Sequence, residues 1–138
     1  MRYLARREYC RAELRAKLLT YATADGSIDA VLDELVARGW LSDERAATQL
    51  LHAKRSRFGT QRIAHELRQK GIAEELISAA LPKLKETELE TARAVWQRKF
   101  GTLPQDAKEK AMQMRFLQSR GFGFDVIFQV LRGGSDIE

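Results

Sequence analysis

The sequence predicts an all-α protein built from three tandem three-helix repeats that stack into an elongated, curved array. Three observations predict this fold. Apolar residues recur at helical spacing along the chain, extended runs of β-forming residues are absent, and short motifs return in the same order. Helices of about 8–15 residues are too short to be stable alone, so they are expected to pack within and between repeats.

The repeat is visible in motifs that recur along the 138 residues. Glu13–Lys17 matches Glu66–Lys70, and Phe116–Arg120 is a looser third copy. One short match would be chance, but several in the same order are typical of a repeat protein. The predicted repeats cover residues 1–41, 42–84 and 85–138, and the first is expected to be truncated at its N-terminus.

The second repeat has the clearest helix boundaries. Ser42 is expected to cap its first helix, and Ala46, Leu50 and Ala53 form the inward stripe. Thr60 is expected to cap the second helix. The third helix is predicted to begin near residue 73, to bury Leu76, Ile77 and Ala80, and to end at Pro82, because proline cannot donate the next helical hydrogen bond.

The other two repeats follow the same pattern. In the third repeat, helices are predicted up to Phe100, near residues 106–120 and near 124–132. In the first repeat, they are predicted near residues 2–8 and 11–19 and before Gly39, with residues 21–26 as a loop. The residues expected to face inward are Leu89, Ala92, Trp96, Phe100, Phe124, Ile127, Phe128 and Leu131, with Val31, Leu32, Leu35 and Val36 in the first repeat.

Charge alternates along the chain in register with the repeats. The net charge is +5 overall, but residues 1–20, 52–70 and 96–120 are basic, whereas the segments that follow each of them are acidic. Each basic block covers the end of a first helix and the whole second helix, so the second helices are expected to line a basic side that binds a polyanion or an acidic protein. The candidate contact residues are Arg6, Arg7, Arg11, Arg15, Lys17, Lys54, Arg55, Arg57, Arg62, Arg68, Lys70, Arg98, Lys99, Lys108, Lys110, Arg115 and Arg120.

An alternative interpretation of these basic residues is purely structural. Lysine and arginine near helix C-termini complement the helix dipole and pair with acids one turn away. Glu13 with Lys17 and Glu66 with Lys70 have that spacing.

No catalytic constellation is evident, so the protein is expected not to be an enzyme and to need no cofactor or metal. His52 and His65 lack metal-binding spacing, Cys10 has no neighbouring base, and no phosphate-binding glycine loop is present. Most aromatic residues at helical spacing are expected to be packed, but Trp40 follows a helix-terminating glycine, where its ring is more easily exposed.

Features of the whole chain indicate the cytoplasm. A single cysteine cannot form an internal disulfide, which fits a reducing compartment. No apolar run approaches the roughly 20 residues needed to cross a bilayer, and the N-terminus lacks the apolar segment of a signal peptide. We therefore expect a cytoplasmic protein, without a membrane partner, that acts as a monomer.

Six segments along the chain share one known order and spacing. They are Tyr3–Leu14, Val31–Leu35, Leu41–Arg45, Ala53–Arg55, Ile63–Ile72 and Arg115–Phe122. Each segment is modest, but their order and spacing together are fairly specific. Through them the chain resembles the bacterial RecX regulatory proteins over nearly its full length.

The resemblance implies tandem three-helix repeats and binding in the helical groove of the RecA–DNA filament. It also implies restraint of ATP hydrolysis and strand exchange, filament disassembly, and a role in DNA repair, homologous recombination and the SOS response. Both single- and double-stranded DNA are candidate partners beside the RecA recombinase. One alternative is a helical DNA-binding module with residues 60–70 as its recognition helix, and another is a scaffold for a different protein.

Overall fold

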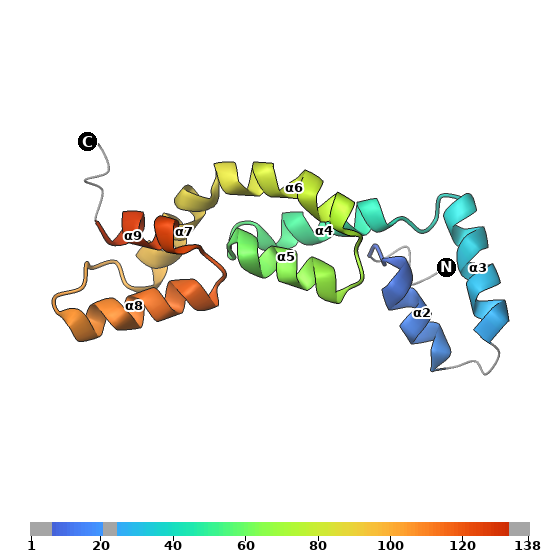
Figure 1. Ribbon diagram of the computed structural model, residues 1–138, viewed down its shortest axis with the longest axis horizontal. Helices are drawn as coiled ribbons and strands as arrows, with labels where there is room; N and C mark the ends of the chain where they lie inside the picture. The colour runs from blue at the N-terminus through green and yellow to red at the C-terminus, as the bar shows by residue number, and fades with distance from the viewer. Residues whose placement is uncertain (1–6, 21–24, 133–138) are drawn as a thin grey trace. The chain divides into compact units, whose positions relative to one another are not determined.

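The computed structural model describes residues 7–20 and 25–132, and all regular structure within them is helical (Figure 1). The repeat array of helices predicted from the sequence is therefore confirmed. The helices are α2 (Arg11–Leu19), α3 (Asp25–Ala37), α4 (Asp43–Lys54), α5 (Thr60–Gln69), α6 (Glu74–Glu86), α7 (Glu88–Lys99), α8 (Ala107–Ser119) and α9 (Phe124–Leu131).

The chain divides into two compact units that do not follow the repeat boundaries. Unit 1 comprises residues 1–52 and 66–77, and unit 2 comprises residues 53–65 and 78–138. The second repeat thus contributes to both units.

Unit 1 has an apolar core between α2 and α3, which lie side by side (Figure 1). Leu14 of α2 meets the face of α3 that carries Leu32 and Leu35 at helical spacing. The buried members of this core are Tyr9, Leu14, Ile28, Leu32, Leu35 and Leu41.

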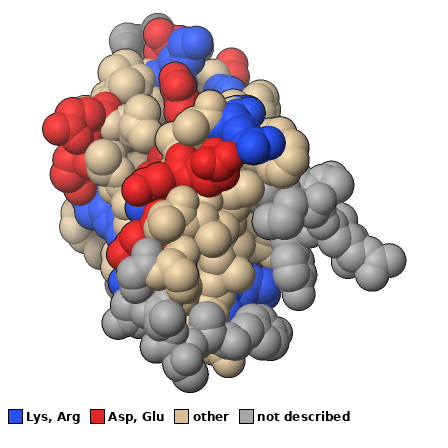
Figure 2. Space-filling model, turned by 90° about the vertical axis from the view of Figure 1, so that its right-hand side faces the viewer, with Lys and Arg blue, Asp and Glu red and all other residues tan. Residues whose placement is uncertain are grey.

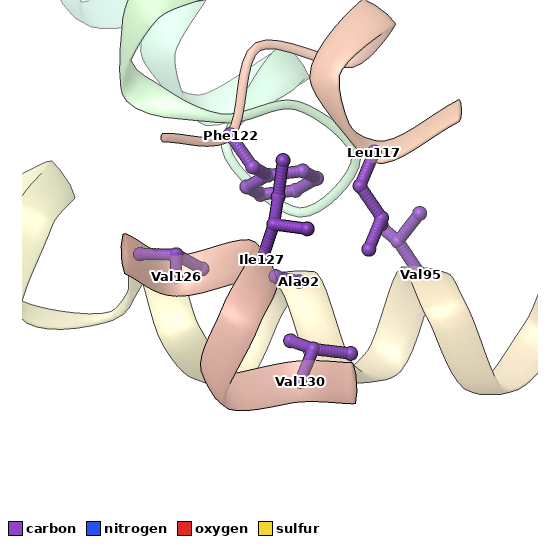
Figure 3. Packing of buried hydrophobic residues seen from close by; sticks show 7 residues of the cluster. All are labelled: Ala92, Val95, Leu117, Phe122, Val126, Ile127 and Val130. Atoms are coloured by element: carbon purple, nitrogen blue, oxygen red, sulfur yellow. The ribbon is translucent and has the colours of Figure 1, made fainter. Parts of the chain in front are cut away.

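Unit 2 has its core where α7, α8 and α9 pack together. In Figure 3 the ring of Phe122 lies beside Ile127, while Leu117 of α8 and Val95 of α7 point toward each other. Next to this core Trp96 donates its indole N–H to the Gln113 side chain at 2.8 Å. The buried members are Ala92, Val95, Leu117, Phe122, Val126, Ile127 and Val130.

Most predicted helix boundaries are confirmed within one or two residues. The N–H of Arg45 donates to the Ser42 hydroxyl oxygen at 3.1 Å, so Ser42 caps α4 as expected. Asp106 caps α8 in the same way, accepting the Glu109 N–H at 2.8 Å. The predicted helix over residues 11–19 is α2.

Some residues predicted to face inward lie on the surface instead. Phe124 is 53% exposed and Phe128 is 46% exposed, and their rings stack on each other with centroids 6.1 Å apart. The core face of α9 is made by Val126, Ile127 and Val130, because the helix turns its valine stripe toward α7. The same correction applies to Val31 and Val36, which are exposed on α3, and to Ala53, which is exposed while Ala47 is buried.

Two predicted helix limits were wrong. α6 continues through Pro82 to Glu86. Proline removes one helical hydrogen bond and crowds the carbonyl four residues before it, and in this helix neither effect ends the helix. α3 already includes Asp25 and Gly26, so the predicted loop is shorter than expected. The predicted helix over residues 2–8 and residues 21–24 of that loop lie outside the described residues or at their edge.

In each of the first two repeats, the first backbone N–H of the second helix donates to a carboxylate of the next repeat. The N–H of Arg11, the first residue of α2, donates to Asp43 Oδ1 at 2.7 Å, and Asp43 is the first residue of α4. The N–H of Thr60, the first residue of α5, donates to Glu88 Oε2 at 3.2 Å, and Glu88 is the first residue of α7. The predicted cap by Thr60 was wrong, because its buried hydroxyl has no hydrogen-bond partner.

Candidate functional site

Each unit contains one junction at which a turn after a second helix packs against the start of another second helix. In the first junction, within unit 1, the carbonyl of Lys70 accepts the Cys10 S–H at 2.8 Å, at the start of α2. In the second junction, within unit 2, the carbonyl of Arg120 accepts the Gly59 N–H at 2.7 Å, at the start of α5. The two junctions are equivalent positions of the repeat.

Close packing in both junctions depends on a glycine with positive φ. A Cβ on Gly71 (φ +84°) would lie 2.7 Å from the Ala12 Cβ. A Cβ on Gly121 (φ +93°) would lie 2.3 Å from the Arg62 Cβ and 2.6 Å from the Arg62 backbone nitrogen. Only glycine adopts this conformation without strain and leaves room for the neighbouring helix.

The first junction neutralises its own charge. Glu13, the third residue of α2, accepts from Arg7 at 2.9 Å and from Lys70 at 2.6 Å. Partial burial opposes ionisation of Glu13, but the hydrogen bonds from Lys70 and Arg7 outweigh it and lower the pKa of this carboxyl. Burial also raises the pKa of the Cys10 thiol, which fits a structural residue rather than a nucleophile.

Ion pairing continues over the rest of α2 and α3. Arg11 binds Asp33 at 2.8 Å, and Arg15 binds Asp29 at 3.1 Å. Figure 2, which views the molecule from the right of Figure 1, shows acidic side chains in a band with basic side chains beside it. These predicted contact residues are therefore engaged within unit 1.

The second junction instead gathers cations around one ring. Four basic side chains lie over Phe58, and we call these five residues the Phe58 cluster. The distances to the ring centroid are 4.4 Å for Arg62, 5.2 Å for Lys54, 5.3 Å for Arg120 and 5.6 Å for Arg57. Cations within about 6 Å of an aromatic face are attracted by its quadrupole, so the ring offsets part of their mutual repulsion.

The cations continue from the cluster onto a second ring. Arg120 also lies 5.0 Å from the centroid of Phe116, and Lys99 lies 5.4 Å from the same ring. Arg98, Lys99, Phe116 and Arg120 line a shallow pocket of about 180 Å³ together with Val95. Among the described residues, no carboxylate lies within 4.0 Å of Arg57, Arg98, Lys99 or Arg120.

The remaining predicted basic residues lie elsewhere. Arg68 pairs with Glu74 at 2.6 Å on the surface, and Arg55 donates to the Thr87 hydroxyl at 3.4 Å. Lys70 binds Glu13 rather than Glu66 one turn away, so that predicted helix pair was wrong. Lys17, Lys108, Lys110 and Arg115 are exposed on α2 and α8, and Arg6 lies outside the described residues.

The short sequence match between the first two repeats pairs positions that are not equivalent in space. Glu13 is the third residue of α2, whereas Glu66 is the seventh residue of α5. The structural counterpart of Glu13 is Arg62, the third residue of α5. The sequence comparison therefore did not show that an acid in one junction is replaced by a base in the other.

The two rings that contact the cations were not predicted from the sequence. Phe58 and Phe116 are half-buried. A usable signal was present, since Tyr9 and Phe58 both stand two residues before a second helix, and Arg7 lies 4.1 Å from the Tyr9 ring centroid. Trp40, the aromatic residue whose place after a helix-terminating glycine made exposure easiest, is 50% exposed, with Arg38 near its ring.

Other kinds of site find no support within the described residues. His52 and His65 are exposed, and no group of three or more potential metal ligands occurs in that part of the chain. Nor does any helix found there have both the length and the apolarity to span a membrane.

The fold and the site define a tandem three-helix repeat protein with a cationic surface cluster. Three family models match the chain in succession, described as the first, second and third three-helix domains of RecX, over residues 1–35, 42–81 and 86–131. The chain belongs to the RecX family of regulatory proteins.

Curated relatives and solved structures agree with this assignment. The regulatory protein RecX of Leptothrix cholodnii is 50% identical over 96% of this chain and 84% of its own length. That of Chromobacterium violaceum is 48% identical over 96% of this chain and 86% of its own length. The crystal structure of RecX from Lactobacillus salivarius has a TM-score of 0.78 at 18% identity, covering 95% of this chain and 88% of the other, and shares the fold.

Proposed function

We propose that this protein binds the RecA–DNA filament and restrains RecA activity as a cytoplasmic, monomeric regulator without a catalytic centre. The observation that carries the proposal is membership of a family of regulatory proteins across all three repeats. Slower ATP hydrolysis and strand exchange and shorter filaments are the expected effects on RecA.

The charge pattern supports a filament as the partner. A filament presents the same surface many times, so one bound chain with several basic sites gains avidity from contacts that are individually weak. The Phe58 cluster and the pocket beside it offer such a site within unit 2.

The test is to add the purified chain to RecA on single-stranded DNA and to follow ATP hydrolysis and filament length. A stoichiometric amount should slow hydrolysis and shorten the filaments, and no effect would contradict the proposal. Reversing charge in the 52–70 and 96–120 blocks together should weaken filament binding more than either reversal alone. The double variant Lys83→Glu/Lys85→Glu is a control, since both lysines are exposed and lie outside the basic blocks.

A second candidate function is direct action on nucleic acid as a DNA-binding module, and the Phe58 cluster is the observation that favours it. Tight binding to naked DNA with no additional effect on RecA would support this alternative. Weak binding to naked DNA beside strong binding to the filament would support the regulator.

A further inference from the structure

We infer that the pocket at the ends of α7 and α8 binds the side-chain carboxylate of an acidic segment in a protein partner. We call it the α7–α8 pocket, and it is lined by Val95, Arg98, Lys99, Phe116 and Arg120. The inference rests on the proposed function only in that the acidic segment is expected to belong to RecA. The pocket itself can be tested without RecA.

Two helices of unit 2 build the pocket from the last turns before their C-termini. On α7, Val95, Arg98 and Lys99 are spaced by three residues and then one, so they share one face of the helix. On α8, Phe116 and the C-cap residue Arg120 are four residues apart and share a face in the same way. Val95 is 4% exposed and belongs to the core of unit 2 (Figure 3), so the pocket has a closely packed, apolar base.

The pocket keeps an excess of positive charge. In the part of the chain that the structure describes, no carboxylate lies within 4.0 Å of Arg98, Lys99 or Arg120. The Phe116 ring contacts two of these cations, with Lys99 5.4 Å and Arg120 5.0 Å from its centroid. Basic residues at helix C-termini complement the helix dipole, but two helix ends supply only about −0.5 charge each against three full positive charges. A net charge of roughly +2 therefore remains to attract an anion.

The size and lining of the pocket indicate the kind of anion. The volume of about 180 Å³ admits the end of one side chain, and the base and one wall are apolar. A carboxylate stands at the end of its side chain, so it can enter with its methylene groups against Phe116 and its oxygens on the cations. The guanidinium groups of Arg98 and Arg120 match both oxygens of a carboxylate. A phosphodiester carries a sugar on each side and fits an open row of cations better than a small pocket.

Binding of fluorescein-labelled hexaglutamate to the full chain, followed by anisotropy, tests the inference. Arg98→Gln/Lys99→Gln removes two charges from the rim of the pocket and should weaken binding roughly tenfold, the size expected for two partly exposed ion pairs. Lys108→Gln/Lys110→Gln removes the same charge from the exposed first turn of α8, within the same basic block, and should leave binding unchanged. Equal losses in the two variants would show that only the net charge of the block matters and would overturn the inference.

A charge-preserving variant separates the loss of charge from a change in structure. Arg98 and Lys99 are both exposed, so their exchange leaves the core of unit 2 intact. Arg98→Lys/Lys99→Arg keeps one arginine and one lysine at the rim and should bind hexaglutamate nearly as well as the wild type. If it binds as weakly as the glutamine variant, positive charge at the rim is not what holds the peptide, and the inference fails.

Two further probes identify the source of the anion. Arg98→Gln/Lys99→Gln should lose much less affinity for labelled oligothymidylate than for hexaglutamate. An equal loss would mean that the pocket takes phosphodiesters as readily as carboxylates, which contradicts the inference. A hexaglutamate peptide with one phosphoserine in place of a glutamate should bind no more tightly than hexaglutamate itself. Tighter binding that disappears in the glutamine variant would assign the pocket to a phosphorylated partner instead.

The effect on RecA is measured separately. If Arg98→Gln/Lys99→Gln binds hexaglutamate like the wild type and both proteins inhibit RecA, the inference fails while the proposed function stands. If the wild type binds hexaglutamate through the pocket but does not affect RecA, the pocket is real and the proposed function fails. Full inhibition of RecA by a variant that no longer binds the peptide would show that RecA does not supply the acid, and the inference would fail in that form.

Discussion

The two junctions have the same architecture but different chemistry. Both close on a positive-φ glycine, and both have an aromatic residue two positions before the helix start. In the first junction Glu13 draws Arg7 and Lys70 together, whereas in the second Arg62 stands at the same helical position and four cations surround Phe58. The third position of the second helix is thus an acid, Glu13, in the junction that only holds the fold together, and a base, Arg62, in the junction that is the candidate binding site.

The largest expected effect concerns the glycines that close the junctions. In Gly121→Ala the new Cβ would meet the Arg62 backbone, and in Gly71→Ala it would meet only the Ala12 methyl group. In Gly39→Ala it would meet nothing within 4 Å. Positive-φ strain alone costs about 1–3 kcal/mol, so the free energy of unfolding should fall in all three and most in Gly121→Ala. Urea denaturation followed by circular dichroism gives the order. An equal loss in Gly39→Ala and Gly121→Ala would show that close packing at the junction adds nothing.

An intermediate effect is expected from removing the acid of the first junction. Glu13→Gln leaves Arg7 and Lys70 without their carboxylate, which should lower the free energy of unfolding by about 1–2 kcal/mol at neutral pH. Because folding lowers the pKa of Glu13, this contribution is complete above its ordinary pKa of 4.5 and disappears as the pH falls through the lower folded value.

The stabilities of wild type and Glu13→Gln should therefore converge in acid. Denaturation of both proteins at a series of pH values measures this. Glu86→Gln, an exposed acid at the end of α6, serves as the control and should track the wild type throughout. A constant difference between wild type and Glu13→Gln at all pH values would mean that the ion pairs do not stabilise the junction.

The smallest effect is expected at Arg68, two residues before Lys70. Its pair with Glu74 lowers the pKa of that carboxyl through a hydrogen bond, but both side chains are exposed to water. Arg68→Ala should leave the urea midpoint unchanged, because exposed ion pairs contribute little. Lys70→Ala should lower it measurably, and identical behaviour of the two variants would remove the distinction between a junction residue and its exposed neighbour.

Local signals in the sequence predicted most helices but not the contacts between them. Ser42 caps α4 as predicted, and α8 begins where a helix was expected, with Asp106 as its cap, because such caps depend on residues a few positions apart. Which face of a helix is buried depends on its neighbour, and the helical spacing of Phe124, Ile127 and Phe128 fitted an inward face of which only Ile127 is buried.

The candidate site was predicted only in part for the same reason. All four cations of the Phe58 cluster were among the predicted contact residues, but so were Arg11 and Arg15, which bind acids of α3. Charge counts along the sequence cannot distinguish the two groups, since the partners are 14 or more residues away and are brought near by packing. The one sequence signal for the Phe58 ring is its place two residues before a second helix, which it shares with Tyr9.

The carboxylates that accept the first N–H of α2 and of α5 limit how such a chain can gain a repeat by duplication or lose one by deletion. Asp43 and Glu88 each belong to the repeat downstream of the helix that they serve. Deleting the second or third repeat at its sequence boundary would remove the carboxylate that accepts the first N–H of the second helix in the repeat before it. A working boundary for recombination must therefore keep that acid with the preceding repeat. In α8 the Glu109 N–H donates to Asp106, which precedes the helix in the same repeat. A copy of the third repeat could therefore be added to a chain without an acid from a following repeat.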